Sequence, residues 1–330
     1  MIKTNKMKRK INIIIIALTV MLALAACSSE PQKPQEPQSP QTTPNDTEQE
    51  NNTSLPSEDR AGNEIKIPSE INRIISISPS NAEMIVALGF GGNLVAVDKY
   101  SEGIEGIPEG IPYFDIMNPD IEQLVALEPD IIYATGMSLS DGRDPFKPLK
   151  DLGITVAYIP SSNSIDGIYG DIMFIADSLK VDAKGQEIVD SMKIKIDEFR
   201  KTGEAIADKK TVYFEIAGAP TLYSFGRGVF LNEMIELLGA ENILADQKEW
   251  VQVSDEVIVA KNPDIILTNV DYIENAVGEI KSRKGWENVT AVKNNDVYYI
   301  DRNASSLSNQ NIIKALEQMA AAIYPEVYKK

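Results

Sequence analysis

The chain has 330 residues, of which 43% are hydrophobic and 25% charged, and its formal net charge is -17 at pH 7. This length allows one large domain or two lobes, and the negative charge argues against nucleic-acid binding, which requires a basic face. Histidine is absent from the sequence, which excludes histidine general bases, histidine-dependent triads and histidine-built metal sites.

Residues 1–26 have the organisation of a secretory signal peptide. Lysine and arginine residues come first, and an apolar run follows from Ile11 to Ala26. This run is shorter than the about 20 residues that a membrane span needs. It leads into LAAC, where Cys27 is the only cysteine of the chain. The ending resembles the bacterial lipobox, which predicts that Cys27 is acylated and becomes the mature N-terminus; an uncleaved membrane anchor is the alternative.

A polar segment follows the cysteine. Residues 28–62 consist mainly of Pro, Gln, Glu, Asn, Ser and Thr. Such a segment buries too little apolar surface to offset the entropy lost on ordering. We therefore expect a disordered tether over residues 27–62 that holds a folded body at the extracytoplasmic face of the cell membrane.

Short apolar, β-branched runs alternate with helical patterns from Ile65 onward. Continuous apolar strands separated by helices are typical of parallel sheets that helices cover on both faces. The predicted strands are residues 73–78, 94–98, 130–135 and 155–160, and then residues 211–216, 264–269 and 296–301. The alternation predicts an α/β fold with an N-terminal lobe at residues 63–182 and a C-terminal lobe at residues 210–330.

Residues 183–209 separate the two strand-rich halves and have strong helix propensity. Ile188, Met192, Ile196 and Phe199 recur there at helical spacing. An ordinary surface helix within one lobe is the alternative. The length and position of the segment favour a single helix that connects the lobes.

The two halves share short sequence repeats in the same order. EMIVALG at residues 83–89 recurs as EMIELLG at residues 233–239, and each copy ends in a glycine. Gly89 and Gly239 are therefore expected to cap the C-termini of two equivalent helices. The shared order indicates two similar lobes, although it does not prove descent from a duplication.

A longer repeat carries a glutamate at the second position of each copy. IEQLVALEPDII begins at Ile121 and DEVIVAKNPDII begins at Asp255, so the two glutamates are Glu122 and Glu256. A carboxylate is stabilised near a helix N-terminus, which explains either residue alone. For both at matched positions, a shared partner that offers a pair of cations is an equally good explanation.

Several segments together resemble the iron-chelate and vitamin B12 class of ABC-transporter substrate-binding proteins. They are RIISISPSNAEMIVALGFGGNLVAVDKYS, NPDIEQLVALEPDII, FLNEMIELLGAENIL, WVQVSDEVIVAKNPDIILTN and NVTAVKNNDVYYID. The resemblance covers about residues 64–326. It implies two Rossmann-like lobes with mostly parallel sheets, joined by one long helix, with the ligand in the cleft between them.

The resemblance also implies a function and partners. Members of this class capture a metal chelate and deliver it to an ABC permease dimer in the membrane; Gram-positive relatives are lipid-anchored. The expected ligand is a ferric siderophore or a corrinoid such as cobalamin, and we expect the protein to be monomeric. In the family, one glutamate on each lobe forms salt bridges with permease arginines, and the matching residues are Glu122 and Glu256.

The resemblance further places aromatic residues in the cleft. Tyr100 and Trp250 match cleft aromatics of the B12-binding member, Tyr223 falls where that member has a phenylalanine, and Phe114 stands in for a further aromatic residue. Aromatic walls suit flat, partly apolar chelates such as corrins, porphyrins and catecholates. Core or surface packing is the alternative for the tyrosines, and Trp286 is expected to be structural.

Basic residues near the expected cleft are candidate contacts for an anionic ligand. Arg227 lies between two glycines, and Lys99 and Arg302 are weaker candidates. Arginine suits catecholate or carboxylate oxygens because it donates two parallel hydrogen bonds. Solvated surface positions are the alternative. Met117 and Met137 fit the cleft floor or ordinary packing.

The sequence departs from the family before its last helix. Gln310 and Asn311 replace a Pro-Arg pair, and Ala304 and Ser308 replace polar contacts of the B12-binding member, so cobalamin specificity is open. We expect no catalytic residue, no cofactor and no metal held by protein side chains, because a chelate brings its metal already coordinated. Tyrosine ligation stays open.

Alternative functions are a haem-binding member of the same class and a surface sensor or scaffold without an importer. An extracytoplasmic hydrolase is disfavoured, because the chain has neither a Gly-x-Ser-x-Gly motif nor a histidine.

Overall fold

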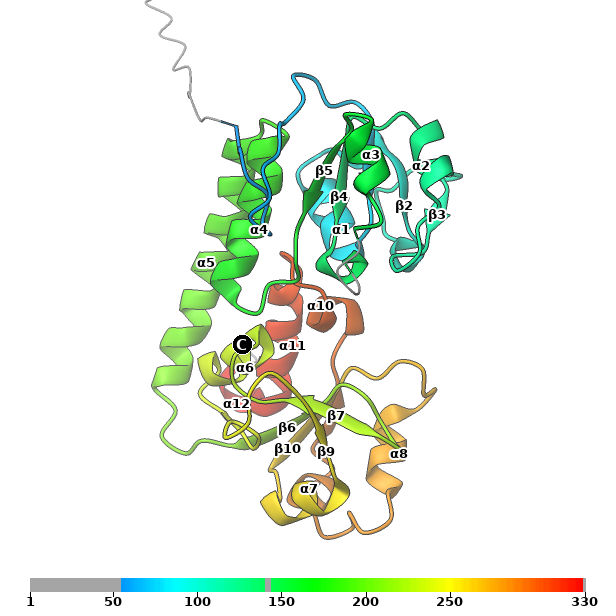
Figure 1. Ribbon diagram of the computed structural model, residues 1–330. Helices are drawn as coiled ribbons and strands as arrows, with labels where there is room; N and C mark the ends of the chain where they lie inside the picture. The colour runs from blue at the N-terminus through cyan, green and yellow to red at the C-terminus, as the bar shows by residue number, and fades with distance from the viewer. Residues whose placement is uncertain (1–54, 140–143, 329–330) are drawn as a thin grey trace, which may run out of the picture. The chain divides into compact units, whose positions relative to one another are not determined.

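The computed structural model describes residues 55–139 and 144–328 (Figure 1). The predicted signal peptide, Cys27 and most of the predicted tether lie outside these residues. The described chain forms an N-terminal and a C-terminal α/β lobe with mostly parallel sheets, as the sequence predicts. Helix α5 (Asp182–Glu204), which has 23 residues, connects the two lobes.

The N-terminal lobe contains a five-stranded sheet in the order β3-β2-β1-β4-β5, and every pair of neighbouring strands is parallel. Its strands are β1 (Ile74–Ser76), β2 (Leu94–Asp98), β3 (Tyr113–Phe114), β4 (Ile131–Ala134) and β5 (Thr155–Tyr158). Its helices are α1 (Pro79–Ala87), α2 (Ile121–Ala126), α3 (Lys147–Asp151) and α4 (Ile165–Ser178). Strands β1 and β4 are buried along their whole length, as expected for a parallel sheet covered on both faces.

The C-terminal lobe contains a four-stranded parallel sheet in the order β11-β10-β6-β8 and a separate antiparallel pair, β7-β9. The strands are β6 (Thr211–Glu215), β7 (Leu222–Phe225), β8 (Glu241–Asn242), β9 (Trp250–Val253), β10 (Ile265–Thr268) and β11 (Val297–Tyr299). The helices are α6 (Phe230–Leu237), α7 (Asp255–Lys261), α8 (Ala276–Ser282), α9 (Thr290–Asn294), α10 (Arg302–Ser306), α11 (Ile312–Ile323) and α12 (Pro325–Tyr328).

Helix α5 packs beside α4 and then against the C-terminal lobe (Figure 1). Val189, Met192 and Ile196 on one face of the helix are buried in the main core cluster. Near the end of the helix, a Cβ added to Gly203 would lie 2.2 Å from the carbonyl oxygen of Leu237. Glycine at this position therefore allows α5 to approach the backbone at the end of α6 closely.

Polar contacts join the lobes away from α5. In α1, the Glu83 carboxylate accepts hydrogen bonds from the side-chain amides of Asn309 at 2.5 Å and Asn311 at 2.9 Å. The Ser80 hydroxyl donates to the carbonyl oxygen of Ser308 at 2.9 Å. The segment that departs from the family pattern thus contacts the opposite lobe through its amides.

The first described residues cover the edge of the N-terminal sheet. Strand β5 is the last strand of that sheet, and the backbone N–H of Arg60 donates to the carbonyl oxygen of Tyr158 at 3.1 Å. The Asp59 carboxylate accepts from the Tyr158 N–H at 2.9 Å and from the backbone N–H groups of Ala61 and Asn63. The segment therefore holds a turn together and satisfies part of the strand edge.

Candidate functional site

Exposed apolar side chains follow the carboxyl ends of three strands in the N-terminal lobe. Tyr100 follows β2, Met117 follows β3 and Met137 follows β4, with exposed fractions of 61%, 52% and 59%. The carboxyl ends of parallel strands meet at one edge of a sheet, which is where open α/β sheets bind ligands. Asp98, whose pKa burial raises, accepts a hydrogen bond from the Tyr100 N–H at 2.8 Å and so fixes this loop.

Three of the exposed aromatic side chains of the C-terminal lobe lie on β7, on β9 or just after β10. Tyr223 on β7, Trp250 on β9 and Tyr272 after β10 are 39%, 49% and 65% exposed. The Trp250 ring packs edge-on against the buried ring of Phe225, with centroids 6.1 Å apart. The Tyr272 hydroxyl accepts a hydrogen bond from the Gly218 N–H at 2.8 Å. These contacts hold the rings in place while they leave large apolar surface open.

A cavity of about 320 Å³ lies beside Trp250. Its other lining residues combine apolar and polar side chains: Ile216, Leu231, Asn269, Arg302, Ser305 and Ser306. The side-chain amide of Asn269 donates to the hydroxyl groups of Ser305 and Ser306 at 3.0 and 3.1 Å. Arg302 forms an ion pair with Asp271 at 2.8 Å.

A second cavity, of about 330 Å³, is lined by both lobes. From the N-terminal lobe it takes Glu83 and the loop of residues 102–105, and from the C-terminal lobe Asn303, Gln310 and Asn311. The loop after Tyr100 therefore lies opposite the segment after Arg302. This cavity therefore lies at the boundary between the two lobes.

Phe114 is placed differently from the prediction. Its side chain is 4% exposed and belongs to a core cluster of the N-terminal lobe. The preceding residue, Tyr113, is 43% exposed, because successive side chains of a strand point to opposite faces. Tyr113 takes the exposed position that the sequence assigns to Phe114.

Arg227 lies in the loop between β7 and α6 with an exposed side chain. Its backbone N–H donates to the Gln247 carbonyl oxygen at 3.0 Å, and its carbonyl oxygen accepts from the Glu249 N–H at 2.8 Å. A Cβ added to Gly226 would lie 2.3 Å from backbone atoms of Gln247. Glycine is therefore needed for this close approach of the two loops, which holds the backbone of Arg227.

The two glutamates of the repeat occupy equivalent positions. Glu122 is the second residue of α2 and Glu256 is the second residue of α7, and both are exposed. Asp120 caps α2 by accepting a hydrogen bond from the Gln123 N–H at 3.1 Å. A hydrogen bond from the Ser254 hydroxyl lowers the pKa of Glu256. Both carboxylates are thus available to a cationic partner.

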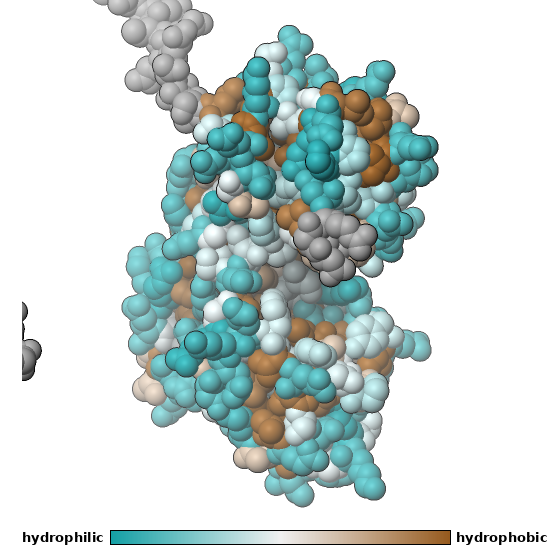
Figure 2. Space-filling view, in the orientation of Figure 1, coloured by the Kyte–Doolittle hydropathy of each residue, from teal (hydrophilic) through white to brown (hydrophobic). Residues whose placement is uncertain are grey.

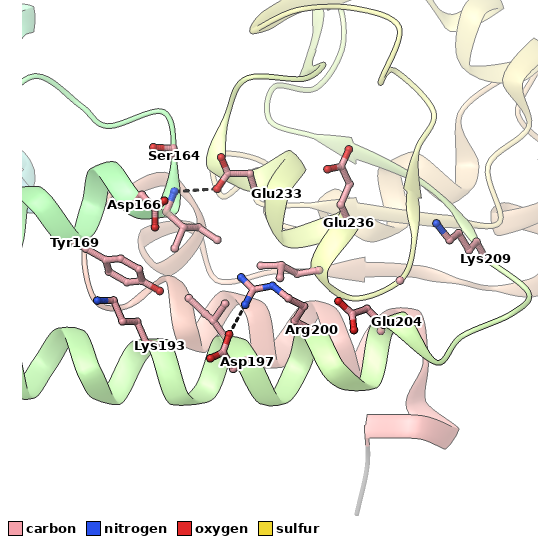
Figure 3. A pocket seen from close by; sticks show the side chains of 15 residues that line it. Ser164, Asp166, Tyr169, Lys193, Asp197, Arg200, Glu204, Lys209, Glu233 and Glu236 are labelled. Atoms are coloured by element: carbon pink, nitrogen blue, oxygen red, sulfur yellow. Dashed lines mark hydrogen bonds and ion pairs between the residues drawn. The ribbon is translucent and has the colours of Figure 1, made fainter. Parts of the chain in front are cut away.

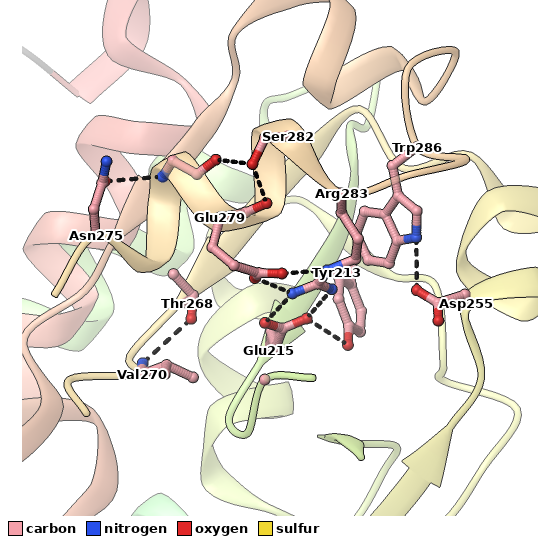
Figure 4. A network of polar contacts seen from close by, with 12 residues as sticks. Tyr213, Glu215, Asp255, Thr268, Val270, Asn275, Glu279, Ser282, Arg283 and Trp286 are labelled. Carbon is pink, nitrogen blue, oxygen red and sulfur yellow. Dashed lines mark hydrogen bonds and ion pairs between the residues drawn. The ribbon is translucent and has the colours of Figure 1, made fainter. Parts of the chain in front are cut away.

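A buried ionic network supports the start of α7 (Figure 4). Arg283 donates to both carboxylate oxygens of Glu215, at 2.8 and 3.1 Å, and also pairs with Glu279. Its guanidinium group lies 4.5 Å from the centroid of the Trp286 ring, and the Trp286 indole N–H donates to Asp255 at 2.8 Å. Trp286, which is 0% exposed, is structural as the sequence predicts. The network links the cavity-side end of β6 to the first residue of α7.

A larger cavity, of about 860 Å³, lies beside α5 (Figure 3). Charged residues line it, and several already have partners: Asp197 pairs with Arg200, and the Lys193 amine lies 5.4 Å from the centroid of the Tyr169 ring. The Glu233 carboxylate accepts a hydrogen bond from the Ile165 N–H, at the first turn of α4, at 2.9 Å. None of the exposed rings described above lines this cavity.

Figure 2 shows a face covered mostly by hydrophilic residues, with apolar residues gathered in places over both lobes. Within residues 55–139 and 144–328, no helix is long and apolar enough to cross a membrane. The same residues contain no cluster of three or more acidic or cysteine side chains suited to a metal ion.

Sequence reasoning missed Tyr113 and Tyr272. Tyr272 follows β10 at its carboxyl end, where open α/β sheets bind ligands, and this position is the signal from which the sequence could have identified it.

Comparisons with known proteins agree with this architecture. A model of the periplasmic binding protein family matches residues 74–304. The chain is 33% identical over 278 residues to the ABC transporter substrate-binding lipoprotein YvrC of Bacillus subtilis, which covers 83% of this chain and 86% of that protein. It is 29% identical over 201 residues to the vitamin B12-binding protein of Yersinia pestis, which covers 60% of this chain and 69% of that protein.

A solved structure is similar as well. A possible iron-binding (periplasmic solute-binding) protein of Staphylococcus epidermidis has 31% sequence identity and a TM-score of 0.69, and the match covers 78% of this chain and 100% of that chain. Together these matches confirm the resemblance and the two-lobed fold that the sequence predicts.

Replacement of the buried Arg283 by an uncharged residue should destabilise the C-terminal lobe, by an amount that depends on pH. We expect Arg283→Met to lower the free energy of unfolding by about 3–5 kcal/mol near pH 7, because Glu215, which is 1% exposed, loses its partner. Burial already raises the pKa of Glu215 above 4.5. Because the pKa of Glu215 is higher in the folded state than in the unfolded state, the folded protein binds more protons at pH values between the two. Its stability therefore falls as the pH rises from the unfolded to the folded pKa. Chemical denaturation should therefore find a smaller loss near pH 5 than near pH 8.

The matched control is the double variant Glu215→Gln with Arg283→Met, which leaves no unpaired charge at position 215. It should recover most of the lost stability and lose the pH dependence. Equal destabilisation of the single and double variants at every pH would contradict this role of the network.

Proposed function

The chain belongs to the periplasmic binding protein family, and from that premise we propose that it is the extracytoplasmic substrate-binding lipoprotein of an ABC importer. Its ligand is a metal chelate with a broad apolar face, such as a corrinoid, a ferric siderophore or haem. The protein binds this ligand in the cleft between its lobes and presents it to the permease.

The observation that carries the proposal is a set of exposed rings and thioethers in both lobes, which lie after the carboxyl ends of parallel strands, on β3 and on the β7-β9 pair. Large apolar side chains that stay in water forgo the free energy of burial, and a flat ligand that covers them restores it. The members of this set are Tyr100, Tyr113, Met117, Met137, Tyr223, Trp250 and Tyr272. The cavity beside Trp250 is at the small end of the range for ligand sites, so side chains from the N-terminal lobe supply the rest of the contact.

Binding of a chelate should be measurable through Trp250. We expect a cognate chelate to quench tryptophan emission and to bind with a Kd below about 1 μM. Trp250→Phe should weaken binding about tenfold, because stacking on the larger indole contributes about 1.4 kcal/mol more. Isothermal titration provides the affinity independently of emission.

Leu152→Ala is the matched control, since Leu152 is an exposed apolar residue at the end of α3 and away from the strand carboxyl ends. Its affinity should equal that of the unmodified protein. Absence of binding across a broad panel of corrinoids, ferric siderophores and haem would refute the assignment of the ligand class.

We further propose that Glu122 and Glu256 dock onto a cationic pair on the permease. Their equivalent positions at the second residue of α2 and α7, and their exposure, support this role. Exposed ion pairs each contribute modestly to affinity but set orientation and encounter rate. Two matched carboxylates on two lobes would therefore fix the protein in one orientation over its transporter.

Charge reversal separates docking from ligand capture. Glu122→Arg with Glu256→Arg should abolish chelate uptake by cells that carry the importer, while the affinity for the chelate stays unchanged. Glu187→Arg with Asp190→Arg, on the exposed face of α5, makes the same change of net charge and should leave uptake intact. Normal uptake by the Glu122 and Glu256 variant would exclude this docking role and favour a surface sensor.

The LAAC sequence supports a lipid anchor at Cys27. We expect Cys27→Ser to leave the protein without its acyl chains, so that fractionation recovers it away from the membrane with its chelate affinity unchanged. Retention in the membrane fraction at the level of the unmodified protein would argue for the uncleaved apolar segment as the anchor.

A further inference from the structure

The cations beside the exposed rings already have carboxylate partners. In the N-terminal lobe, the Lys99 amine donates a short hydrogen bond to Asp115. In the C-terminal lobe, Arg302 forms its ion pair with Asp271 at 2.8 Å. All four side chains are between 40% and 53% exposed. Each lobe thus presents a neutralised pair at the ligand surface, and not a free positive charge.

Both pairs adjoin predicted ligand contacts. The Lys99 amine lies 5.2 Å from the centroid of the neighbouring Tyr100 ring, and Arg302 lines the cavity beside Trp250. The bond to Asp115 raises the pKa of Lys99, and the pKa of Asp115 is lowered by the same bond, as an ion pair requires. A ligand that covers Tyr100 or Trp250 would therefore contact a positive and a negative side chain together.

Other charges around the site are mainly negative. Glu83, Glu102 and Glu105 line the cavity between the lobes, and that cavity has no basic lining residue among the described residues. Arg227 is the one cation named for this site that has no side-chain ion pair or hydrogen bond in the part of the chain that the structure describes. The balance of charge at the site disfavours a ligand with several negative charges.

We infer that the site selects chelates that carry no net negative charge, namely uncharged or cationic metal chelates with an apolar face, and rejects polyanionic ones. The inference rests on the proposed function and narrows its ligand class. A polyanionic chelate would lie near the carboxylates of Glu83, Glu102 and Glu105. It would also have to share Lys99 with Asp115 and Arg302 with Asp271. Such a repulsive element gives discrimination without lowering the affinity for an uncharged ligand.

The first experiment compares probes of different charge by isothermal titration. Cyanocobalamin has no net charge, ferrioxamine B is cationic, haem carries anionic propionates, and ferric enterobactin is a polyanionic tris(catecholate). We expect cyanocobalamin or ferrioxamine B to bind at least about 100-fold more tightly than ferric enterobactin, a difference of about 2.7 kcal/mol. Tightest binding of haem or ferric enterobactin would overturn the charge inference and leave the proposed function standing. Failure of all these probes to bind would count against the proposed function itself.

The second experiment releases the cations. Asp115→Asn with Asp271→Asn should raise the affinity for ferric enterobactin by about tenfold and lower the affinity for ferrioxamine B, because Lys99 and Arg302 lose their partners. The gain should shrink as salt is added. Asp151→Asn with Asp197→Asn removes the same charge from ion pairs on α3 and α5, and should change neither affinity. An unchanged preference in the first double variant, or the same change in both, would overturn the inference.

Discussion

Parallel strand pairing is the constraint on which the site depends. Every neighbouring pair in the two main sheets is parallel, so the carboxyl ends of all these strands lie at one edge of their sheet. The inner strands β1, β4 and β10 are buried along their whole length, which leaves the outer strands and the loops beyond the sheets to carry exposed side chains. Tyr100, Met117, Met137 and Tyr272 all follow such an end. The antiparallel pair β7-β9 adds Tyr223 and Trp250, and it is the part of the C-terminal lobe that departs from the parallel plan.

The support beneath this edge is ionic as well as apolar. Glu215 ends β6 and is neutralised by Arg283, whose guanidinium group packs on Trp286; the same indole holds Asp255 at the start of α7. Strand β6 leads directly into Ile216, which lines the cavity beside Trp250. Arg283 therefore connects the strand that leads into this cavity with the helix that carries Glu256.

Much of this arrangement could be predicted from the sequence, and the rest could not, for physical reasons. Continuous β-branched runs identify the parallel strands, and the repeated phrase places Glu122 and Glu256 at the second residue of two short helices. Strand β3 has only two residues, so its sequence does not show which of the two side chains is buried. The prediction places Phe114 on the exposed side, whereas Phe114 is buried and Tyr113 is exposed. The pairing of Lys99 with Asp115 and of Arg302 with Asp271 depends on how loops fold back, which spacing alone does not specify.

The turn around Asp59 has a consequence for self-association of the protein. An uncovered outer strand is a template on which another chain can add its own strand, and the product is an aggregate. Here the backbone around Arg60 already occupies part of the outer side of β5. The remaining outer strands of the main sheets, β3, β8 and β11, have only two or three residues each. Strands of this length offer few backbone groups for pairing with another chain. The outer strands of the two main sheets are therefore either partly covered or short, which limits the addition of a strand by another chain.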